Sequence, residues 1–308
     1  MKRVLVTGAT GFVGANLTRR LLEVGHEVHL LVRPLHSTWR IEAIQDEVKL
    51  HVVDMADSGD LEKTISAISP EWVFHLATHG AYSWQGDVPQ MIQTNIVSTV
   101  NLVNACLRVG FDVFVNTGSS SEYGFKSFAP AETTWLDPNS HYAWTKAAAT
   151  HFCRYTALSQ QVHIPTLRLY SVYGPYEEPE RLLPTVIRLG LKGQLPPLVN
   201  PAIARDYVYV DDVVSAYICA ATQPGQEFGA VFNVGTGVQT SLREVIELAR
   251  RILPVSQEPL WGSMEDRAWD THVWVADNSR ITTTLRWQPQ YSFEQGFRAM
   301  VQWYRHHQ

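Results

Sequence analysis

Two side chains with complementary acid–base chemistry stand four positions apart in the segment 138–146. At that spacing Tyr142 and Lys146 would lie on one face of a helix. A phenol ordinarily has a pKa of about 10, and a nearby ammonium lowers that pKa by favouring the phenolate. Such a tyrosine can pass a proton to or from a reacting oxygen. The same pair also occurs on ordinary helix surfaces, so the assignment needs support from the rest of the chain.

A group of hydroxyls follows the apolar run 113–116. Thr117 and Ser119–Ser121 stand where that strand would end, and ligands bind at the carboxyl ends of parallel strands. We expect Ser119 to hydrogen-bond the reacting oxygen and to share the proton with Tyr142. A plain serine-rich turn is the alternative. The order strand, loop and helix argues against it, because it directs both hydroxyls at one cleft.

A glycine-rich turn joins the first expected strand to the first expected helix. Gly8 permits a tight turn, Gly11 lets the backbone approach a pyrophosphate, and Gly14 lets helix and strand pack closely. The helix N-terminus adds amide donors and the positive end of its dipole. The spacing GxxGxxG departs from the common GxGxxG, but the position after a strand is the required one. We therefore expect a dinucleotide here, bound by Gly8, Thr10, Gly11, Phe12, Val13 and Gly14.

The end of the second expected strand indicates which dinucleotide binds. An acidic residue there would bind the adenosine ribose and disfavour a 2′-phosphate. This chain has Val32 followed by Arg33. Arg33, with Ser37 or Arg40 as a helper, is suited to pair with a phosphate. We therefore expect NADP(H) in preference to NAD(H), with a solvated surface arginine as the alternative.

Apolar strands alternate with amphipathic helices through the first half of the chain. The expected strands are 4–7, 28–32, 48–53, 71–77, 113–116 and 166–170, and the expected helices are 12–24, 88–109 and 141–159. This alternation predicts an α/β fold with a doubly wound parallel sheet, the Rossmann fold.

The pattern changes after residue 174, where proline and glycine become frequent. We expect a short helix at 183–191, strands at 208–210 and 231–234 that return to the sheet, then two helices and a long loop around Gly262. The predicted dinucleotide-binding domain covers 1–171, with 206–235 and about 272–280 returning to it. The segments 172–205 and most of 236–308 would form a smaller substrate-binding lobe.

Composition excludes several classes of partner. The chain has 308 residues, of which 45% are apolar and 18% charged, an ordinary balance for a soluble globular protein. Its net charge of -5 argues against nucleic acid, and no apolar run approaches the roughly 20 residues that span a membrane. The three cysteines are odd in number and widely spaced, so we expect buried thiols in a cytoplasmic protein.

These motifs resemble the extended short-chain dehydrogenase/reductase family, the NAD(P)-dependent epimerases, dehydratases and reductases of nucleotide sugars. The resemblance covers nearly the whole chain. Besides the glycine turn, it rests on His75-Leu76-Ala77, Asn95, Ser119, Tyr142, Lys146, Arg168–Pro175 and Arg205–Asp212. It implies that Ser119, Tyr142 and Lys146 are catalytic. It also implies a homodimer through the helices 88–109 and 141–159, with no metal in the site.

The resemblance and the strand ends together assign further contacts. Cofactor contacts would also come from Arg33, Asp54, Met55, Leu76, Ala77, Thr78, Asn95, Thr117, Tyr142, Lys146, Tyr170 and Val172. Contacts with the nucleotide sugar would come from His79, Ser119, Ser120, Ser121, Tyr142, Ser171, Arg181, Arg205, Arg267 and Asp270. Arg205 and Arg267 match arginines that clamp a diphosphate in relatives, and Asp270 matches an aspartate that holds a ribose. A turn role for Asp54 and a solvated loop position for Arg267 are the alternatives.

Departures from the family pattern narrow the expected reaction. Dehydratases of this family carry Asp and Glu directly after the residue that matches Ser119, whereas this chain has Ser120 and Ser121. Without an acid and a base there, we expect no dehydration. The loop resembles that of GDP- and CDP-4-keto-6-deoxyhexose reductases of deoxysugar biosynthesis. It favours reduction of a sugar at C4, with Tyr142 as the proton donor.

Two other functions stay open at this stage. One is a 4-epimerase that holds NAD tightly and passes through a transient 4-keto sugar. The other belongs to a different class, a non-catalytic NADP sensor or scaffold. The presence of Ser119, Tyr142 and Lys146 argues against the second, because function follows the site and not the fold.

Overall fold

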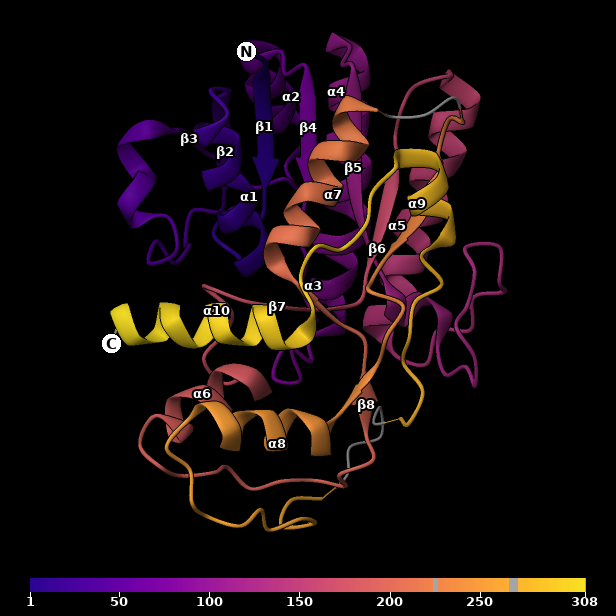
Figure 1. The fold of residues 1–308 in the computed structure, drawn as a ribbon. Helices are drawn as coiled ribbons and strands as arrows, with labels where there is room; N and C mark the ends of the chain where they lie inside the picture. The colour runs from indigo at the N-terminus through magenta and orange to yellow at the C-terminus, as the bar shows by residue number, and fades with distance from the viewer. Residues whose placement is uncertain (224–226, 266–270, 308) are drawn as a thin grey trace.

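Seven parallel strands form the central layer of the molecule (Figure 1), in the order β10-β6-β5-β4-β1-β2-β3. The computed structural model describes residues 1–223, 227–265 and 271–307. The strands are β1 (Arg3–Thr7), β2 (Glu27–Val32), β3 (Lys49–Val52), β4 (Trp72–His75), β5 (Val113–Ser119), β6 (Thr166–Leu169) and β10 (Val231–Val234). The central strands are apolar along their length because helices cover both faces of the sheet. This arrangement confirms the predicted doubly wound fold.

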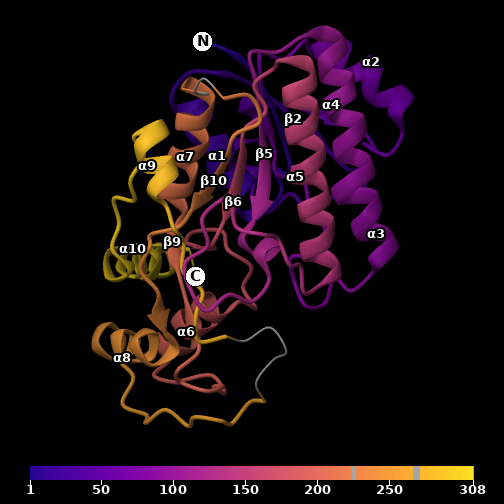
Figure 2. The same ribbon diagram turned by 90° about the vertical axis from the view of Figure 1, so that its right-hand side faces the viewer.

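The two helical layers lie on opposite faces of the sheet (Figure 2). One face is covered by α2 (Ser58–Ile68), α4 (Ser98–Val109) and α5 (His141–Gln160), which share a hydrophobic core with the strands. The other face is covered by α1 (Phe12–Glu23), α7 (Val210–Thr222) and α9 (Ser279–Leu285), which share a second core. A short 3-10 helix, η1 (Glu42–Glu47), precedes β3.

A third hydrophobic core lies below the sheet (Figure 1) and is formed by α6 (Leu182–Gly190), α8 (Leu242–Ile252) and α10 (Phe293–His306). Two short ladders accompany it. The strands β8 (Ala204–Arg205) and β11 (Thr240–Ser241) pair antiparallel, and β7 (Ser171–Tyr173) and β9 (Tyr207–Tyr209) pair in parallel. The chain therefore passes between the sheet and this lobe several times after β6. The division of the chain into two domains at particular residues stays a prediction.

Two expectations about the elements were wrong. The strand expected at 208–210 to return to the sheet is β9, and among the described residues it pairs with β7, because a short run of alternating aromatic and valine residues does not specify its partner. Three helices (α8, α9 and α10) follow residue 236 in the described part of the chain, where we expected two. The helix expected at 88–109 is confirmed, with a π-helical turn (Gln93–Val97) between α3 (Val88–Ile92) and α4.

Two α-helices of the described residues, α2 and α7, lay outside the sequence predictions. Helix α2 connects β3 and β4, and it begins after Asp57, whose carboxylate accepts hydrogen bonds from the amides of Gly59 and Asp60. That N-cap was a readable signal. In the described residues, none of the helices is both long and apolar enough to cross a membrane.

Candidate active site

The side chains of Tyr142, Ser119 and Thr78 meet at the carboxyl edge of the sheet. Ser119 is the last residue of β5, and Tyr142 lies in the first turn of α5, whose N-terminus is capped by Ser140. Thr78 comes from the loop after β4. The Tyr142 hydroxyl lies close to the Ser119 and Thr78 hydroxyls, which act on its pKa as hydrogen-bonding groups. The strand end and the helix start thus bring together the two hydroxyls that sequence placed in one cleft, and they add a third.

Burial raises the pKa of Tyr142 to about 12. Its hydrogen bonds with Ser119 and Thr78 act in the opposite direction, and the charges of Glu122 and Tyr82 add to the rise. The expectation that a nearby ammonium lowers the pKa of Tyr142 below its ordinary value was therefore wrong. Loss of solvation outweighs the effects that lower this pKa, so Tyr142 is a phenol at neutral pH.

Lys146 lies one turn further along α5 and is only 3% exposed. Burial lowers the pKa of this amine, and the charge of Glu122 opposes that change. Lys146 also lies near His75 at the end of β4, where burial, aided by Lys146, lowers the pKa of the imidazole to about 3. The two His75 ring nitrogens are hydrogen-bonded to the hydroxyls of Thr7 and Thr99, at 2.8 and 2.9 Å. His75 is thus a buried neutral imidazole next to Lys146.

The glycine turn between β1 and α1 has the shape that a pyrophosphate needs. Gly8 has a positive φ of 71°, and a Cβ on Gly14 would lie 2.3 Å from the Gly8 carbonyl oxygen. Gly11 is the N-cap of α1 and supplies no side-chain hydrogen bond. The first amides of α1 therefore point outward from a tight backbone turn, the arrangement that binds phosphate. These residues fit a dinucleotide.

Of the residues expected to bind a 2′-phosphate after β2, Arg40 has a different role in the structure. Val32 is buried and Arg33 is exposed, as a 2′-phosphate site requires. Arg40, however, is buried, and its guanidinium donates to the Tyr176 carbonyl at 2.7 Å, to the Thr10 carbonyl at 3.3 Å and to Glu178 at 2.8 Å. The proposed help from Arg40 in binding a phosphate was wrong, because its donors connect the glycine turn to the loop after β7.

Asn95 is hydrogen-bonded to other residues of the protein. It lies in the π-helical turn, where its amide accepts from Thr78 Oγ1 and His79 N and donates to the His79 carbonyl and Thr145 Oγ1, at 2.8–3.0 Å. Every hydrogen-bonding position of the amide is used, so Asn95 fixes the loop that carries Thr78. The Asp54 carboxylate accepts from the Ala56 amide at 2.9 Å, as a turn residue does. The cofactor contacts expected of Asn95 and Asp54 stay predictions.

The other predicted cofactor residues gather near the strand ends. Leu76 is buried, and the amide of Ala77 donates to Thr7 Oγ1 at 3.2 Å. The Thr117 hydroxyl pairs with Tyr217 at 2.6 Å. The remaining positions follow β3 and β6 and comprise Met55, Tyr170 and Val172.

The predicted substrate residues line two loops and the lobe. Burial lowers the pKa of His79, and the nearby charge of Arg33 lowers it further. The guanidinium of Arg181 lies 5.9 Å from the centre of the Tyr82 ring, and Arg205 lies 5.6 Å from the centre of the Trp274 ring. Ser171 begins β7. Arg267 and Asp270 lie outside the described residues.

A pocket lies beside Ser120, where it is lined by Tyr123, Lys126, Phe128, Tyr170 and Trp274 among others. The Tyr170 hydroxyl is buried and has no hydrogen-bond partner among the described residues. Sequence reasoning placed Ser120 and Tyr170 in the site but missed Lys126, Phe128 and Trp274. Their positions in long loops carry no readable pattern, because the loops approach the sheet only in the folded chain.

A Rossmann sheet with a glycine turn at β1, and Ser119, Tyr142 and Lys146 at β5 and α5, defines an extended short-chain dehydrogenase/reductase. Residues 4–235 match the model of the NAD dependent epimerase/dehydratase family, and the chain belongs to that family. Its members that resemble this chain are nucleotide-sugar epimerases and dehydratases, so the protein is an NAD(P)-dependent enzyme of this kind.

Similar proteins span the full length of the chain. A UDP-glucose 4-epimerase of Mycolicibacterium smegmatis is 32% identical over 98% of both chains. A dTDP-glucose 4,6-dehydratase of Neisseria meningitidis is 27% identical over 99% of this chain and 93% of its own. The solved UDP-glucuronic acid 4-epimerase of Bacillus cereus, in complex with UDP-glucuronic acid and NAD, has a TM-score of 0.88, with 27% identity and 99% of both chains covered.

Proposed function

We propose that the protein is a nucleotide-sugar 4-epimerase. The observation that carries this proposal is the juxtaposition of Ser119 at the end of β5 with Tyr142 at the start of α5, with serines and not carboxylates at positions 120 and 121. This site can move one proton at a sugar oxygen but lacks the acid and base that elimination of a hydroxyl needs. The similarity to a 4-epimerase over 98% of the chain supports the same choice.

Inversion at C4 leaves the sugar neither oxidised nor reduced. One O–H and one C–H bond at C4 break, and both form again with the C–H bond on the opposite face. The phenolate form of Tyr142 accepts the hydroxyl proton and returns it, while Ser119 and Thr78 hold the oxygen. The positive charge of an oxidised nicotinamide, when bound, would favour that form over the phenol. A bound nicotinamide supplies the hydride acceptor and donor. We propose that Arg181 and Arg205 pair with the diphosphate of the substrate, because the planar guanidinium matches phosphate oxygens.

We propose NAD(H) as the cofactor. The commitment of Arg40 to Glu178 leaves only Arg33 and Ser37 of the predicted phosphate contacts. Solved relatives such as the Bacillus cereus enzyme and a UDP-glucose 4-epimerase of Thermus thermophilus contain NAD. Denaturing the purified protein and identifying the released dinucleotide by mass spectrometry tests this proposal. Released NADP would contradict it.

A second candidate is the reduction of a nucleotide-linked 4-keto-6-deoxyhexose with NADPH. The observation that favours it is the exposed Arg33 after the buried Val32, where a carboxylate would exclude a 2′-phosphate. The assay that separates the candidates follows NADPH absorbance with a 4-keto-6-deoxy sugar nucleotide, and epimer formation by NMR with UDP-hexoses. A protein that binds dinucleotide tightly but converts neither substrate would be a sensor or scaffold.

Tyr142→Phe removes the hydroxyl of the proposed acid/base. Turnover should fall at least about 100-fold, while dinucleotide binding stays within about threefold. Tyr155→Phe is the matched control, because Tyr155 is on the same helix but 71% exposed. The measurements are kcat and cofactor affinity. Full activity in Tyr142→Phe would overturn the acid/base assignment.

We also propose that two copies form a homodimer through the helical segments 88–109 and 141–159. The solvent-facing side of α5 carries Trp144, Tyr155 and Leu158, which are between 50% and 71% exposed. The spacing of 11 and then 3 residues places them along one stripe of the helix. An apolar stripe of this kind on an otherwise polar surface marks an interaction site.

A further inference from the structure

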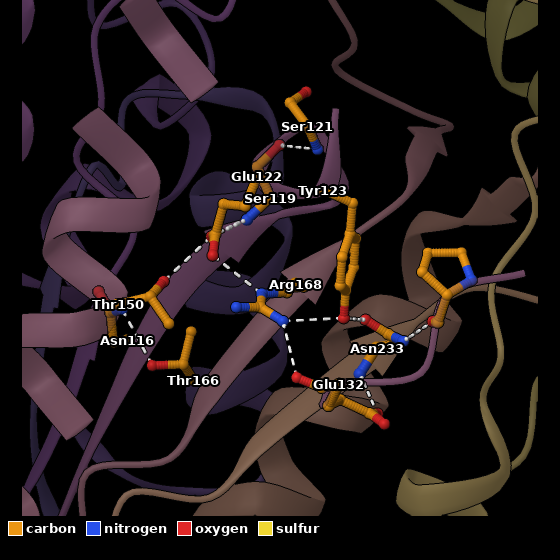
Figure 3. A network of polar contacts seen from close by, with 11 residues as sticks. Asn116, Ser119, Ser121, Glu122, Tyr123, Glu132, Thr150, Thr166, Arg168 and Asn233 are labelled. Carbon is orange, nitrogen blue, oxygen red and sulfur yellow. Dashed lines mark hydrogen bonds and ion pairs between the residues drawn. The ribbon is translucent and has the colours of Figure 1, made fainter. Parts of the chain in front are cut away.

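Glu122 is a buried carboxylate directly behind the candidate active site. It belongs to the 3-10 turn η3 (Ser120–Tyr123) after β5, and its exposure is 0%. One carboxylate oxygen accepts from the Ser119 amide at 2.8 Å and from Thr150 Oγ1 at 3.0 Å. The other accepts from Nε of Arg168 at 2.8 Å (Figure 3). Glu122 thus connects the end of β5 to α5 and β6.

Arg168 is itself held from the far side. Its guanidinium donates to the Tyr123 hydroxyl at 2.8 Å and lies 4.6 Å from the centre of that ring. The Tyr123 hydroxyl in turn donates to Asn233 on β10, also at 2.8 Å (Figure 3). Removing an ionised carboxylate from water is costly unless it is paired and hydrogen-bonded, and here both conditions are met. These partners therefore hold the Glu122 carboxylate in a fixed orientation.

This arrangement acts on Ser119 at two atoms. Glu122 accepts from its backbone amide, and the Ser119 hydroxyl accepts from the Ser121 amide at 3.2 Å, which completes a reciprocal capping box. The same hydroxyl is the one that pairs with Tyr142. A serine side chain has a single χ angle, so the position of its oxygen depends mainly on the position of its backbone. By holding the Ser119 amide, the Glu122 carboxylate therefore positions the Ser119 hydroxyl oxygen.

We propose that Glu122 is a positioning residue for the proton transfer, which fixes Ser119 against Tyr142 and places a permanent negative charge behind both. This proposal rests on the proposed function. Tyr142 faces Ser119, Thr78, Tyr82 and Glu122, and Lys146 faces Glu122, Cys153 and His75. Of these, Glu122 carries the buried negative charge. It favours the protonated form of both Tyr142 and Lys146.

Two substitutions of Glu122 distinguish its role in positioning Ser119 from the effect of its charge. Glu122→Ala removes the acceptor for the Ser119 amide and should lower kcat about 100-fold, with KM within about threefold, because a small displacement of a reacting group is that costly. Glu122→Gln keeps an acceptor oxygen but removes the charge. It should lower kcat less than about tenfold and shift to lower pH the limb of kcat that reports ionisation of Tyr142. Simple structural damage would lower activity without moving that limb.

Gln295→Ala is the matched control. It removes the side chain that completes the reciprocal capping box at the start of α10, outside the candidate active site. Its kcat should stay within about threefold of wild type, and its pH profile should not move. An equal loss in Gln295→Ala and Glu122→Ala would overturn the proposal, as would an unshifted pH profile in Glu122→Gln.

Loss of Glu122 leaves the Arg168 charge buried alone, so the single variants are at risk of unfolding. The double variant Glu122→Gln with Arg168→Met removes both charges and should show the same pH shift. Hydrogen exchange of the Ser119 amide is independent of turnover. It should quicken at least about tenfold in Glu122→Ala, and wild-type protection there would contradict the positioning role. If wild type converts no sugar nucleotide although this exchange result holds, the proposed function fails and the positioning of Ser119 does not.

Discussion

Tyr142 and Lys146 lie side by side on α5, and loss of solvation acts on them in opposite directions. Burial raises the pKa of the phenol and lowers that of the amine, so each is pushed towards its neutral form. The negative charge of Glu122 raises both values and so favours an ammonium beside a phenol. These groups of the protein therefore favour the phenol form of Tyr142, which is the form that donates a proton.

Glu177 is a second buried carboxylate, but it lacks the partners of Glu122. One oxygen lies 3.6 Å from Nε of Arg181, and the other has no partner among the described residues. Burial raises the pKa of Glu177 to about 8. The folded protein therefore keeps this proton up to about pH 8, while the unfolded chain loses it near the ordinary value of about 4.5. The stability that this proton provides is lost as pH rises across that window.

Glu177→Gln stays neutral at every pH. We expect its free energy of unfolding, relative to wild type, to be at least about 1 kcal/mol higher at pH 8.5 than at pH 5, since one pKa unit is worth about 1.4 kcal/mol. Urea denaturation at the two pH values measures this difference. Glu180→Gln, which removes an exposed carboxylate from the same loop, is the control. A difference that does not change with pH in Glu177→Gln would contradict the assignment.

The glycines of the turn between β1 and α1 allow close backbone contact between neighbouring elements. Gly14 faces the carbonyl of Gly8, and a Cβ on Gly8 would meet the backbone of Leu76 and Ala77 at 2.6 Å. Strand β4, the glycine turn and the first turn of α1 are therefore in backbone contact. Any side chain at these positions pushes the helix start away from the strand end where the dinucleotide is expected to lie.

Gly14→Ala should therefore destabilise the protein by about 1–3 kcal/mol and weaken dinucleotide binding, because the clash is with backbone. The control is Gly59→Ala in the first turn of α2, where the nearest atom to a new Cβ is 3.6 Å away. That change should be neutral or stabilising by up to about 1 kcal/mol. Chemical denaturation and calorimetric titration with NAD measure the two effects. Equal stability of the two variants would contradict the packing argument.

Local patterns were enough to predict the sheet, the glycine turn and the placement of Ser119 before Tyr142. Apolar period and turn glycines depend on near neighbours, and the parallel order follows from their alternation with helices. What could not be predicted depends on contacts between distant segments. The partner of β9, the commitment of Arg40 to Glu178 and the full engagement of Asn95 are of this kind. Glu122 is intermediate, because Ser119-x-x-Glu122 is a readable capping box.

At the scale of the whole molecule, helix α5, which carries the exposed stripe, is on the side of the sheet opposite to α7 and α9 (Figure 2). It lies away from the lobe formed by α6, α8 and α10, so a second copy bound there would leave the substrate lobe accessible. The same helix carries Tyr142 on its inner side. Association would therefore also steady the helix that holds the acid/base.

Tyr155→Asp places a charge in the centre of the stripe. We expect wild type to be a dimer at micromolar concentration and the variant to dissociate at least about tenfold more readily, since a charge in an apolar interface is poorly solvated. Leu260→Asp, at a side chain that is also 71% exposed but belongs to the loop after α8, is the control. Sedimentation velocity measures all three. A monomeric wild type would rule out the interface.

The link made by Arg40 also has a consequence for cofactor engineering. An exchange of NAD for NADP could be attempted by grafting the loop after β2 from another enzyme, because this loop lies where the adenosine ribose is bound in such folds. In this protein such a graft would remove the residue that joins Thr10 in the glycine turn to Tyr176 and Glu178 near the lobe. Tyr176 has a positive φ of 68°, a conformation that its neighbours must hold in place. A successful redesign would have to keep Arg40 and Glu178 and confine the sequence changes to 33–39.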